Sequence, residues 1–452
     1  MAILFTMLVI SWVIYMIIKK YYPQAVLLIA GILLLLATYF LGIQPILGAK
    51  ESSGAPLLDI FHTIKTLLSS RTAGLGLTIM SIAGFAKYME YVGASRSLFA
   101  VVASPLKMIK SPYVLLVLGF FISQFLVLFI PSHAGLGLLL MVTMYPIFIR
   151  AGVSKLSALG VIGCAQYIDV GPGSGNAIMA AKIANLDPAI YFVQYQLPIF
   201  LTTTLVLGIV HYFVQKWWDK KEGFTGSDLS IENLKEEEER PPLIYAVLPI
   251  IPMVFILGFS PLLKSTIKMD VVTAMFLSTF IGMIFEYVRT RDFRSTLQGL
   301  KNLYDGMGTS FATVVSLIVA GEVFAAGLMK IGAVDALTNS AQSLGLGAHG
   351  LIILFCFVIA SCAFLMGSGN AAFFSFSALA PKIATAMKID VIQLILPMQI
   401  MTSFGRVVSP ITAAIVAIAG VAGVSPVQVV KRTAIPMIVA AAINIGFIFF
   451  NF

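Results

Sequence analysis

Long apolar runs separated by short polar segments fill most of this chain, and many of them reach the roughly 20 residues that an α-helix needs to span a bilayer. Full spans are predicted at residues 3–18, 24–43, 74–92, 190–214, 243–259, 271–288, 309–329 and 427–449. The pattern predicts an all-α polytopic membrane protein. Amphipathic segments at 57–68 and 293–304 are expected to form short helices on the membrane surface.

Two apolar segments in the first half are interrupted at mid-length by polar, Gly and Pro residues. The segment 112–150 is interrupted at Ser132, which predicts a re-entrant hairpin, and 156–185 is interrupted between Asp169 and Asn176, which predicts a broken helix. Irregular backbone is tolerated at membrane depth only where protein buries it or where it lines a wet cavity. Two such breaks in succession therefore predict a binding site.

The second half repeats this pattern. Pro172, Pro188 and Pro198 recur as Pro410, Pro426 and Pro436, each 238 positions later. Paired interrupted segments of this kind indicate a transporter built from a duplication. The predicted units are a first repeat (1–215), a cytoplasmic linker (216–241) and a second repeat (242–452) with its own hairpin at 347–386 and broken helix at 391–422.

Each repeat then has five transmembrane crossings plus one re-entrant hairpin. Five is an odd number, so the two repeats face opposite ways in the membrane, which predicts an inverted repeat. With the linker inside, 18 of the 29 Lys and Arg residues lie on the cytoplasmic side and 9 lie outside. This bias predicts that both termini are outside.

Composition agrees with a membrane protein, since 59% of the residues are hydrophobic, 11% are charged and the mean hydropathy is +0.98. The net charge of +9 does not indicate a nucleic-acid partner, because no soluble basic domain carries it. Three cysteines within apolar runs give no disulfide or metal framework. The first apolar run lacks a preceding basic residue and a cleavage site, so it is expected to be a retained span.

The two hairpin tips and the two helix breaks place four helix N-termini near mid-membrane. Such N-termini carry free N–H groups and a partial positive charge, which favours an anion. Ser132, Ser174, Ser368 and Thr412 are placed either to cap these helices or to bind a ligand.

Ionisable residues inside apolar runs are costly and suggest function. Arg406 lies in the second broken helix and could bind a carboxylate through two parallel hydrogen bonds. The alternative is a structural ion pair, for which Asp169 at the first break is the natural partner. Asp169 is also a candidate to carry a coupling proton or cation, as is Glu322. His133 could couple protons or could simply make a hydrogen bond at the tip.

Amides at the breaks are a further set of candidates. Asn176 and Asn370 offer oxygens suited to a cation, including Na⁺ at the hairpin tips, or N–H groups suited to a carboxylate. No cofactor and no other metal site are expected.

The Ser-x-Ala-Gly-x-Gly tip, the Gly-Pro-x-Ser-Gly break, the Gly-Ser-Gly-Asn-Ala tip, the Gly-Arg-Val-Val-Ser-Pro segment and residues 424–433 resemble the anaerobic C4-dicarboxylate carriers of the DcuC family. The resemblance covers essentially the whole chain. It implies the ion-transporter superfamily fold, an elevator movement, a homodimer and a bacterial inner-membrane location. The implied substrates are succinate, fumarate and malate, carried by exchange, efflux or cation-coupled uptake. The substrate site then comprises residues at the tips and breaks, namely Ser132, Gly171, Ser174, Gly175, Asn176, Ser368, Gly369, Asn370, Arg406, Ser409 and Thr412. His133 at the first tip is a further substrate-binding candidate that the resemblance does not assign.

Other functions stay open at this point. One is a carrier of the same fold for amino acids or short-chain carboxylates, and another is a channel. An intramembrane serine hydrolase using Ser368 or Ser174 is a remote alternative, because neither serine lies in a complete Gly-x-Ser-x-Gly motif. An enzyme is therefore not expected.

Overall fold

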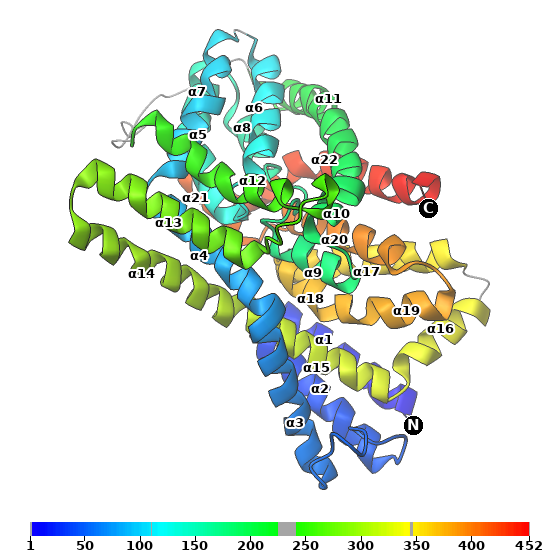
Figure 1. The fold of residues 1–452 in the computed structure, drawn as a ribbon. Helices are drawn as coiled ribbons and strands as arrows, with labels where there is room; N and C mark the ends of the chain where they lie inside the picture. The colour runs from blue at the N-terminus through cyan, green and yellow to red at the C-terminus, as the bar shows by residue number, and fades with distance from the viewer. Residues whose placement is uncertain (1, 110, 225–240, 344–346, 452) are drawn as a thin grey trace.

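The computed structural model describes residues 2–109, 111–224, 241–343 and 347–451, and these residues form helices and connecting loops without a β-strand (Figure 1). By length and composition, seven of the described helical segments are suited to cross a membrane: 23–40, 133–150, 188–221, 271–290, 293–330, 348–366 and 426–450. The protein is a multi-pass membrane protein. The predicted inversion of the two repeats and the re-entry of the hairpins remain predictions.

The first half contains eleven α-helices with shorter 3₁₀ and π turns between them. In chain order they are α1 (Ala2–Ile18), α2 (Pro23–Phe40), α3 (Pro56–Arg71), the π turn η1 (Thr72–Gly76), α4 (Leu77–Tyr91), α5 (Ala94–Val102), the 3₁₀ turn η2 (Ser104–Met108), α6 (Pro112–Val127), α7 (His133–Arg150), α8 (Lys155–Gly163), α9 (Gly175–Ile183), α10 (Pro188–Ile190), the π turn η3 (Tyr191–Gln196) and α11 (Leu197–Lys221).

The described part of the second half follows a similar order. It contains the 3₁₀ helix η4 (Leu243–Ile250), α12 (Ile251–Gly258), the 3₁₀ turn η5 (Pro261–Leu263), α13 (Val271–Thr290), α14 (Phe293–Ser310), the π turn η6 (Phe311–Val315), α15 (Ser316–Lys330), α16 (Ala333–Ser343), α17 (Ala348–Met366), α18 (Gly369–Phe376), the 3₁₀ turn η7 (Ser377–Leu379), α19 (Ala380–Met387), α20 (Val391–Val407), α21 (Ala413–Ala422) and α22 (Pro426–Asn451).

The amphipathic segments predicted as separate surface helices are instead continuous with the spans that follow them. α3, η1 and α4 form one helix over residues 56–91, and α14, η6 and α15 form one of 38 residues over 293–330. At 1.5 Å per residue the latter is about 57 Å long, roughly twice the hydrocarbon thickness. Neither junction contains a proline, and a π turn at each lets the apolar face change direction without ending the helix.

The two long helices run in opposite directions and cross near their π turns, since α4 packs on α14 and α3 on α15 (Figure 1). Glycines permit this approach. A Cβ atom on Gly84 would lie 2.7 Å from the Leu303 carbonyl oxygen, and one on Gly306 would lie 2.7 Å from that of Ala83. Small residues at such contacts let helix backbones approach closely in membranes.

The two predicted hairpins and the two predicted broken helices are helix–break–helix units in the structure. α6 and α7 join through residues 128–132, and α17 joins α18 through Gly367, whose φ of +62° suits glycine. The first broken helix (α8, α9) is interrupted at 164–174. The second (α20, α21) is interrupted at 408–412, where Pro410 lacks the N–H that a continuing helix requires.

α20 lies at the centre of the molecule, and nearly all of its side chains are buried against α9, α17, α18 and α22 (Figure 1). The segment 216–241 begins as helix, since α11 continues to Lys221 and buries Asp219. The rest of the predicted linker, 225–240, lies outside the described residues.

Candidate functional site

A buried ion pair joins the two helix breaks. Arg406, near the end of α20, faces Asp169, which lies in the loop between α8 and α9, and both are at most 6% exposed. Arg406 Nη2 lies 2.7 Å from Asp169 Oδ1 and Nη1 lies 3.0 Å from Oδ2. The ion pair that the sequence analysis expects as one of two roles for Arg406 is therefore present, in the bidentate geometry that Arg–carboxylate pairs favour.

Three further side chains fix the Asp169 carboxylate. Asn176 Nδ2, at the start of α9, donates to Oδ2 over 2.6 Å, and Gln166 Nε2 donates to Oδ1 over 3.0 Å. Ser403 Oγ, one turn before Arg406 on α20, lies 3.2 Å from Oδ2. Both oxygens of the Asp169 carboxylate therefore have side-chain donors in addition to Arg406.

The backbone at Asp169 is held by side chains of α20 and η3. Gln399 Nε2 and Gln196 Nε2 donate to the Asp169 carbonyl oxygen over 2.6 and 3.1 Å. Gln399 Oε1 in turn accepts from Tyr191 Oη and Gln196 Nε2. This irregular backbone therefore keeps its hydrogen bonds within the protein, as an apolar surrounding requires.

Several buried polar atoms around the ion pair have no hydrogen-bond partner among the described residues. They are Arg406 Nε, Asn176 Oδ1, Gln166 Oε1 and His133 Nδ1. A buried polar atom without a partner costs about 1–3 kcal/mol, and native proteins tolerate few of them away from functional sites. The set combines a cationic donor with amide oxygens, which suits an anion and a cation respectively.

The predicted serines cap helices at the tips and at the first break. Ser132 Oγ accepts from Gly135 N–H, Ser174 Oγ from Ala177 N–H and Ser368 Oγ from Ala371 N–H, over 3.1 to 3.5 Å. Thr412 makes no such cap, and its hydroxyl donates to the Arg406 carbonyl oxygen over 2.6 Å. Capping was one of the two roles predicted for these residues.

The hairpin tips are tied to the breaks. In the first half, Gln166 Nε2 donates to the Pro131 carbonyl oxygen over 3.1 Å, and His133 Nε2 lies 3.4 Å from the Gly163 carbonyl oxygen. In the second, the Ser409 hydroxyl donates to the Phe364 carbonyl oxygen over 2.6 Å. Gly369 touches the ion pair directly, because a Cβ atom there would lie 3.2 Å from Arg406 Cδ.

The remaining predicted residues lie near the breaks without joining the ion-pair network. Gly171 has a φ of +83° and donates its N–H to Gln196 Oε1 over 3.0 Å. A Cβ atom on Gly175 would lie 3.4 Å from Ile79 of α4, so this glycine packs at an apolar contact. Asn370 is partly exposed at the second tip.

Glu322 lies away from this centre. Both of its oxygens accept from Arg71 Nε, over 2.8 and 2.7 Å, which joins α15 to the end of α3. The two residues lie 251 positions apart in the sequence. In the described residues no group of three or more His, Cys, Asp or Glu side chains could hold a metal ion.

A second buried ion-pair cluster centres on Arg432, which is 1% exposed. Arg432 Nη1 lies 2.8 Å from Asp219 Oδ1, and Nη2 lies 2.6 Å from Glu222 Oε2. Ser154 and Ser157 also donate to Asp219, each over 2.7 Å. Arg432 therefore ties α22 to α11 and to the start of α8.

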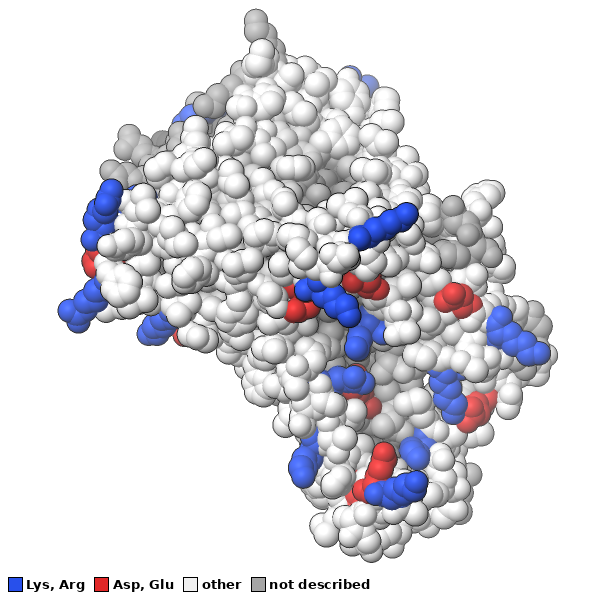
Figure 2. Space-filling model, viewed as in Figure 1, with Lys and Arg blue, Asp and Glu red and all other residues white. Residues whose placement is uncertain are grey.

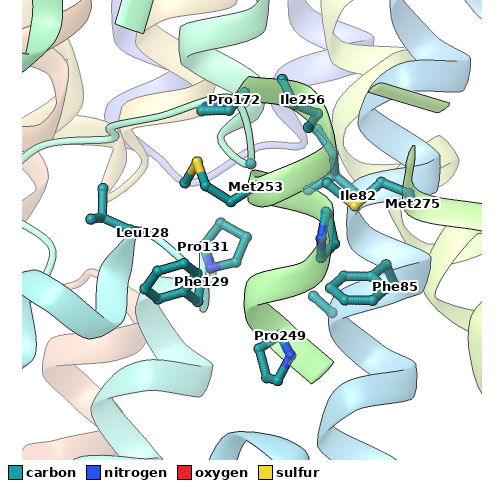
Figure 3. A pocket seen from close by; sticks show the side chains of 13 residues that line it. Ile82, Phe85, Leu128, Phe129, Pro131, Pro172, Pro249, Met253, Ile256 and Met275 are labelled. Carbon is teal, nitrogen blue, oxygen red and sulfur yellow. The ribbon is translucent and has the colours of Figure 1, made fainter. Parts of the chain in front are cut away.

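The first tip and the first break also meet a group of apolar side chains. Leu128, Phe129 and Pro131 of the tip and Pro172 of the break face Phe85 of α4, Met253 of α12 and Met275 of α13 around a space of about 20 Å³ (Figure 3). A single water molecule needs at least about 10–15 Å³. This contact is therefore an apolar packing surface, not a substrate chamber.

Sequence reasoning found the ion pair but not the polar side chains around it. Gln166, Gln196, Gln399 and Ser403 are all buried. Glutamines inside apolar runs are a usable signal, since polar side chains at membrane depth require partners. The sequence does not show which of these four side chains contact Asp169, because three of them belong to segments distant from Asp169 in the sequence.

Comparison with known proteins gives a consistent result. The family model described as DcuC, C4-dicarboxylate anaerobic carrier, matches residues 1–452. The chain is 37% identical over 425 residues to a probable anaerobic C4-dicarboxylate transporter DcuC of Vibrio cholerae, covering 94% of this chain and 92% of that one. It is 33% identical over 429 residues to the anaerobic C4-dicarboxylate transporter DcuC of Escherichia coli K12, covering 95% and 92%.

Two solved transporters share the fold. The YdaH transporter of Alcanivorax borkumensis superposes with a TM-score of 0.60 at 14% identity, covering 96% of this chain and 99% of that one. MtrF of Neisseria gonorrhoeae, described among antimetabolite efflux pumps, superposes with a TM-score of 0.63 at 18% identity, covering 95% and 96%. At these identities the likeness concerns the fold alone.

Proposed function

Because the chain belongs to the DcuC family of anaerobic C4-dicarboxylate carriers, we propose that it is a secondary active transporter of succinate, fumarate and malate. The family and its named relatives are transporters, not enzymes. The observation that carries the proposal is the buried Arg406–Asp169 pair, with the unpartnered Arg406 Nε beside it, at the junction of both helix breaks. A substrate carboxylate binds Arg406 there.

Charge balance gives Asp169 a coupling role. The ion pair is neutral, and one guanidinium fork cannot hold the Asp169 carboxylate and a substrate carboxylate in the same bidentate way. Substrate binding therefore requires Asp169 to turn away or to be neutralised by H⁺ or Na⁺. The unpartnered oxygens of Asn176 and Gln166, both next to Asp169, are suited to Na⁺. His133, Asn370 and Glu322 are the other coupling candidates.

The packing of the hairpins supports an elevator mechanism. Hydrogen bonds tie both tips to the breaks, and α7 of the first hairpin packs on α21 of the second broken helix. We treat these elements as one moving body that carries the capping serines Ser132, Ser174 and Ser368, together with Ser409 and Thr412. Its apolar contact with α4, α12 and α13 (Figure 3) is suited to sliding, since it contains few directional bonds.

The protein is proposed to act in the bacterial cytoplasmic membrane as a homodimer with both termini outside.

Counterflow in proteoliposomes tests the substrate class. Vesicles loaded with succinate, fumarate or malate should accumulate external radiolabelled succinate, and vesicles loaded with a short monocarboxylate should not. Exchange supported by a monocarboxylate and not by succinate would instead establish a carrier of another organic anion on this fold.

A further inference from the structure

A cavity of about 400 Å³ lies outside the ion-pair centre, between the long helices and the units proposed to move. Its walls come from α3, η1 and α15 on one side and from α9, η7 and α19 on the other. Figure 2 shows Lys, Arg, Asp and Glu side chains gathered around hollows on this face, over the region where Figure 1 shows α9, α15 and α19. Small-molecule sites in proteins typically measure about 300–1,000 Å³, so the cavity is large enough for a small anion.

Three charged side chains line the cavity: Arg71, Lys182 and Glu322. Glu322 accepts only from Nε of Arg71, and among the described residues no acceptor engages the two Nη groups of that guanidinium. The Arg71 side chain is 37% exposed and Lys182 is exposed, whereas Glu322 is buried. The lining therefore carries one net positive charge, with its free donors on the two cations.

The remaining lining is mostly apolar. Leu75, Met179 and Ile183 are among the side chains that cover the walls between the charges. Low-polarity walls focus the field of the cations into the cavity and strengthen their attraction for an anion. A chain of a few methylene groups ending in carboxylates matches this combination of apolar wall and separated cations.

The cavity is connected to the ion-pair centre through α9. Asn176, which donates to Asp169, and Lys182, which lines the cavity, lie on the same helix. Six residues at 1.5 Å each place them about 9 Å apart along the axis. Lys182 is therefore within two helical turns of Asn176, whose amide contacts the carboxylate partner of Arg406.

We propose that this cavity is a second anion site, an entry vestibule that binds the dicarboxylate through Arg71 and Lys182 before it reaches Arg406. The inference rests on the proposed transport function and adds a substrate subsite to it. Glu322 holds Arg71 in the absence of substrate, just as Asp169 holds Arg406. In each case a substrate carboxylate competes with an internal one for the same guanidinium.

The concentration dependence of succinate counterflow tests the vestibule. Lys182→Gln removes one cation without leaving a buried charge unpaired. Arg71→Gln combined with Glu322→Gln removes the second ion pair as a neutral unit, which avoids an isolated buried carboxylate. Lys382→Gln is the matched control, because Lys382 lies on the same helix as the lining residue Pro381 but pairs with Asp335 outside the cavity.

We expect the KM for succinate to rise about tenfold in Lys182→Gln and in the double variant, as follows from losing one charge-assisted contact. The maximal rate of Lys182→Gln should stay within about twofold, and Lys382→Gln should match the wild type. An unchanged KM in both cavity variants, with counterflow intact in the wild type, would overturn the vestibule.

A labelling experiment separates this failure from failure of the transport function. The thiol of a Lys182→Cys variant should react with an anionic methanethiosulfonate, and succinate should slow that reaction. If wild-type vesicles show no dicarboxylate counterflow, the proposed transport function fails. The effect of succinate on the labelling rate then tests the anion site independently of transport. Protection supports an anion site, and labelling at an equal rate with and without succinate contradicts it.

Discussion

At the scale of single residues, the described part of the molecule buries two arginines, each in an ion pair that joins distant segments. Arg406 with Asp169 and Arg432 with Asp219 are each almost fully enclosed. The first pair has unpartnered polar atoms of three neighbouring side chains around it, which supports a ligand site. Arg432 Nε also has no partner among the described residues, but the carboxylate of the second pair is surrounded by protein hydroxyls, which supports a structural role.

Asp169→Asn should uncouple transport from its driving ion. The asparagine amide has the size of the aspartate side chain but carries no negative charge. Arg406 is then free to bind substrate without neutralisation of residue 169 by H⁺ or Na⁺. Exchange of succinate should persist, while accumulation driven by an imposed H⁺ or Na⁺ gradient should be lost. Uptake into proteoliposomes with and without each gradient measures this. Gradient-driven accumulation equal to that of the wild type would exclude Asp169 as the coupling group.

Arg432→Met should destabilise the protein without a specific effect on substrate affinity. Removing one partner of a buried ion pair leaves the other charge uncompensated, at a cost of about 3–5 kcal/mol. The double variant Arg432→Met with Asp219→Leu removes both charges and should recover part of that loss. Thermal unfolding in detergent compares the three proteins. A double variant as unstable as the single one would contradict this account of the cluster.

Sequence reasoning predicts Arg406 and Asp169 because a charge inside an apolar run is visible in the sequence. It does not predict Gln196 and Gln399 as partners of the Asp169 carbonyl, because their roles depend on three-dimensional contact. Arg71 and Arg432 illustrate the same limit. Both look like ordinary charges at the end of a span, and only the fold brings a carboxylate to each.

At the scale of elements, the helix breaks follow directly from local sequence and the long helices do not. Pro172, Pro410 and Gly367 interrupt helices for steric reasons that hold in any fold, so helix ends lie close to each of them, while the re-entry of the hairpins stays a prediction. The junctions at η1 and η6 contain no such residue. The change from an amphipathic to an apolar pattern therefore predicts two separate helices. In the structure a π turn joins them into one helix.

The contact between α4 and α14 makes a prediction at this scale. Gly306→Ala places a methyl group 2.7 Å from the Ala83 carbonyl oxygen and should destabilise the protein by about 1–3 kcal/mol. Gly308→Ala is the control, because its Cβ atom meets nothing within 4 Å on the same helix. That substitution should be neutral or stabilise by about 0.5–1 kcal/mol. Equal unfolding temperatures for the two variants would show that the helices can separate at little cost.

At the scale of the whole molecule, the proposed moving body meets the rest through the apolar contact around Met253 and Leu128. Cysteines in the Leu128→Cys and Met253→Cys double variant should form a cross-link with a short bifunctional thiol reagent and stop counterflow. A pair at Gly137 and Ile418, which touch within the proposed moving body, is the matched control and should leave counterflow intact. Full activity of a cross-linked 128–253 pair would contradict a sliding contact there.

Both helix breaks meet at the ion pair of Arg406 and Asp169, in a fold that the chain shares with two solved transporters. The Arg406 guanidinium is proposed to bind a substrate carboxylate. The most direct test compares succinate counterflow by the wild type and two variants: Arg406→Lys, and Arg406→Gln combined with Asp169→Asn. The double variant removes both charges together, so that the fold is retained, as thermal unfolding would check.

Lysine keeps the charge but not the planar fork, so Arg406→Lys should lose at least about tenfold in succinate affinity, and the neutral double variant should show no counterflow. Counterflow by the neutral variant with the wild-type KM would contradict the account, because the substrate would then be bound without Arg406.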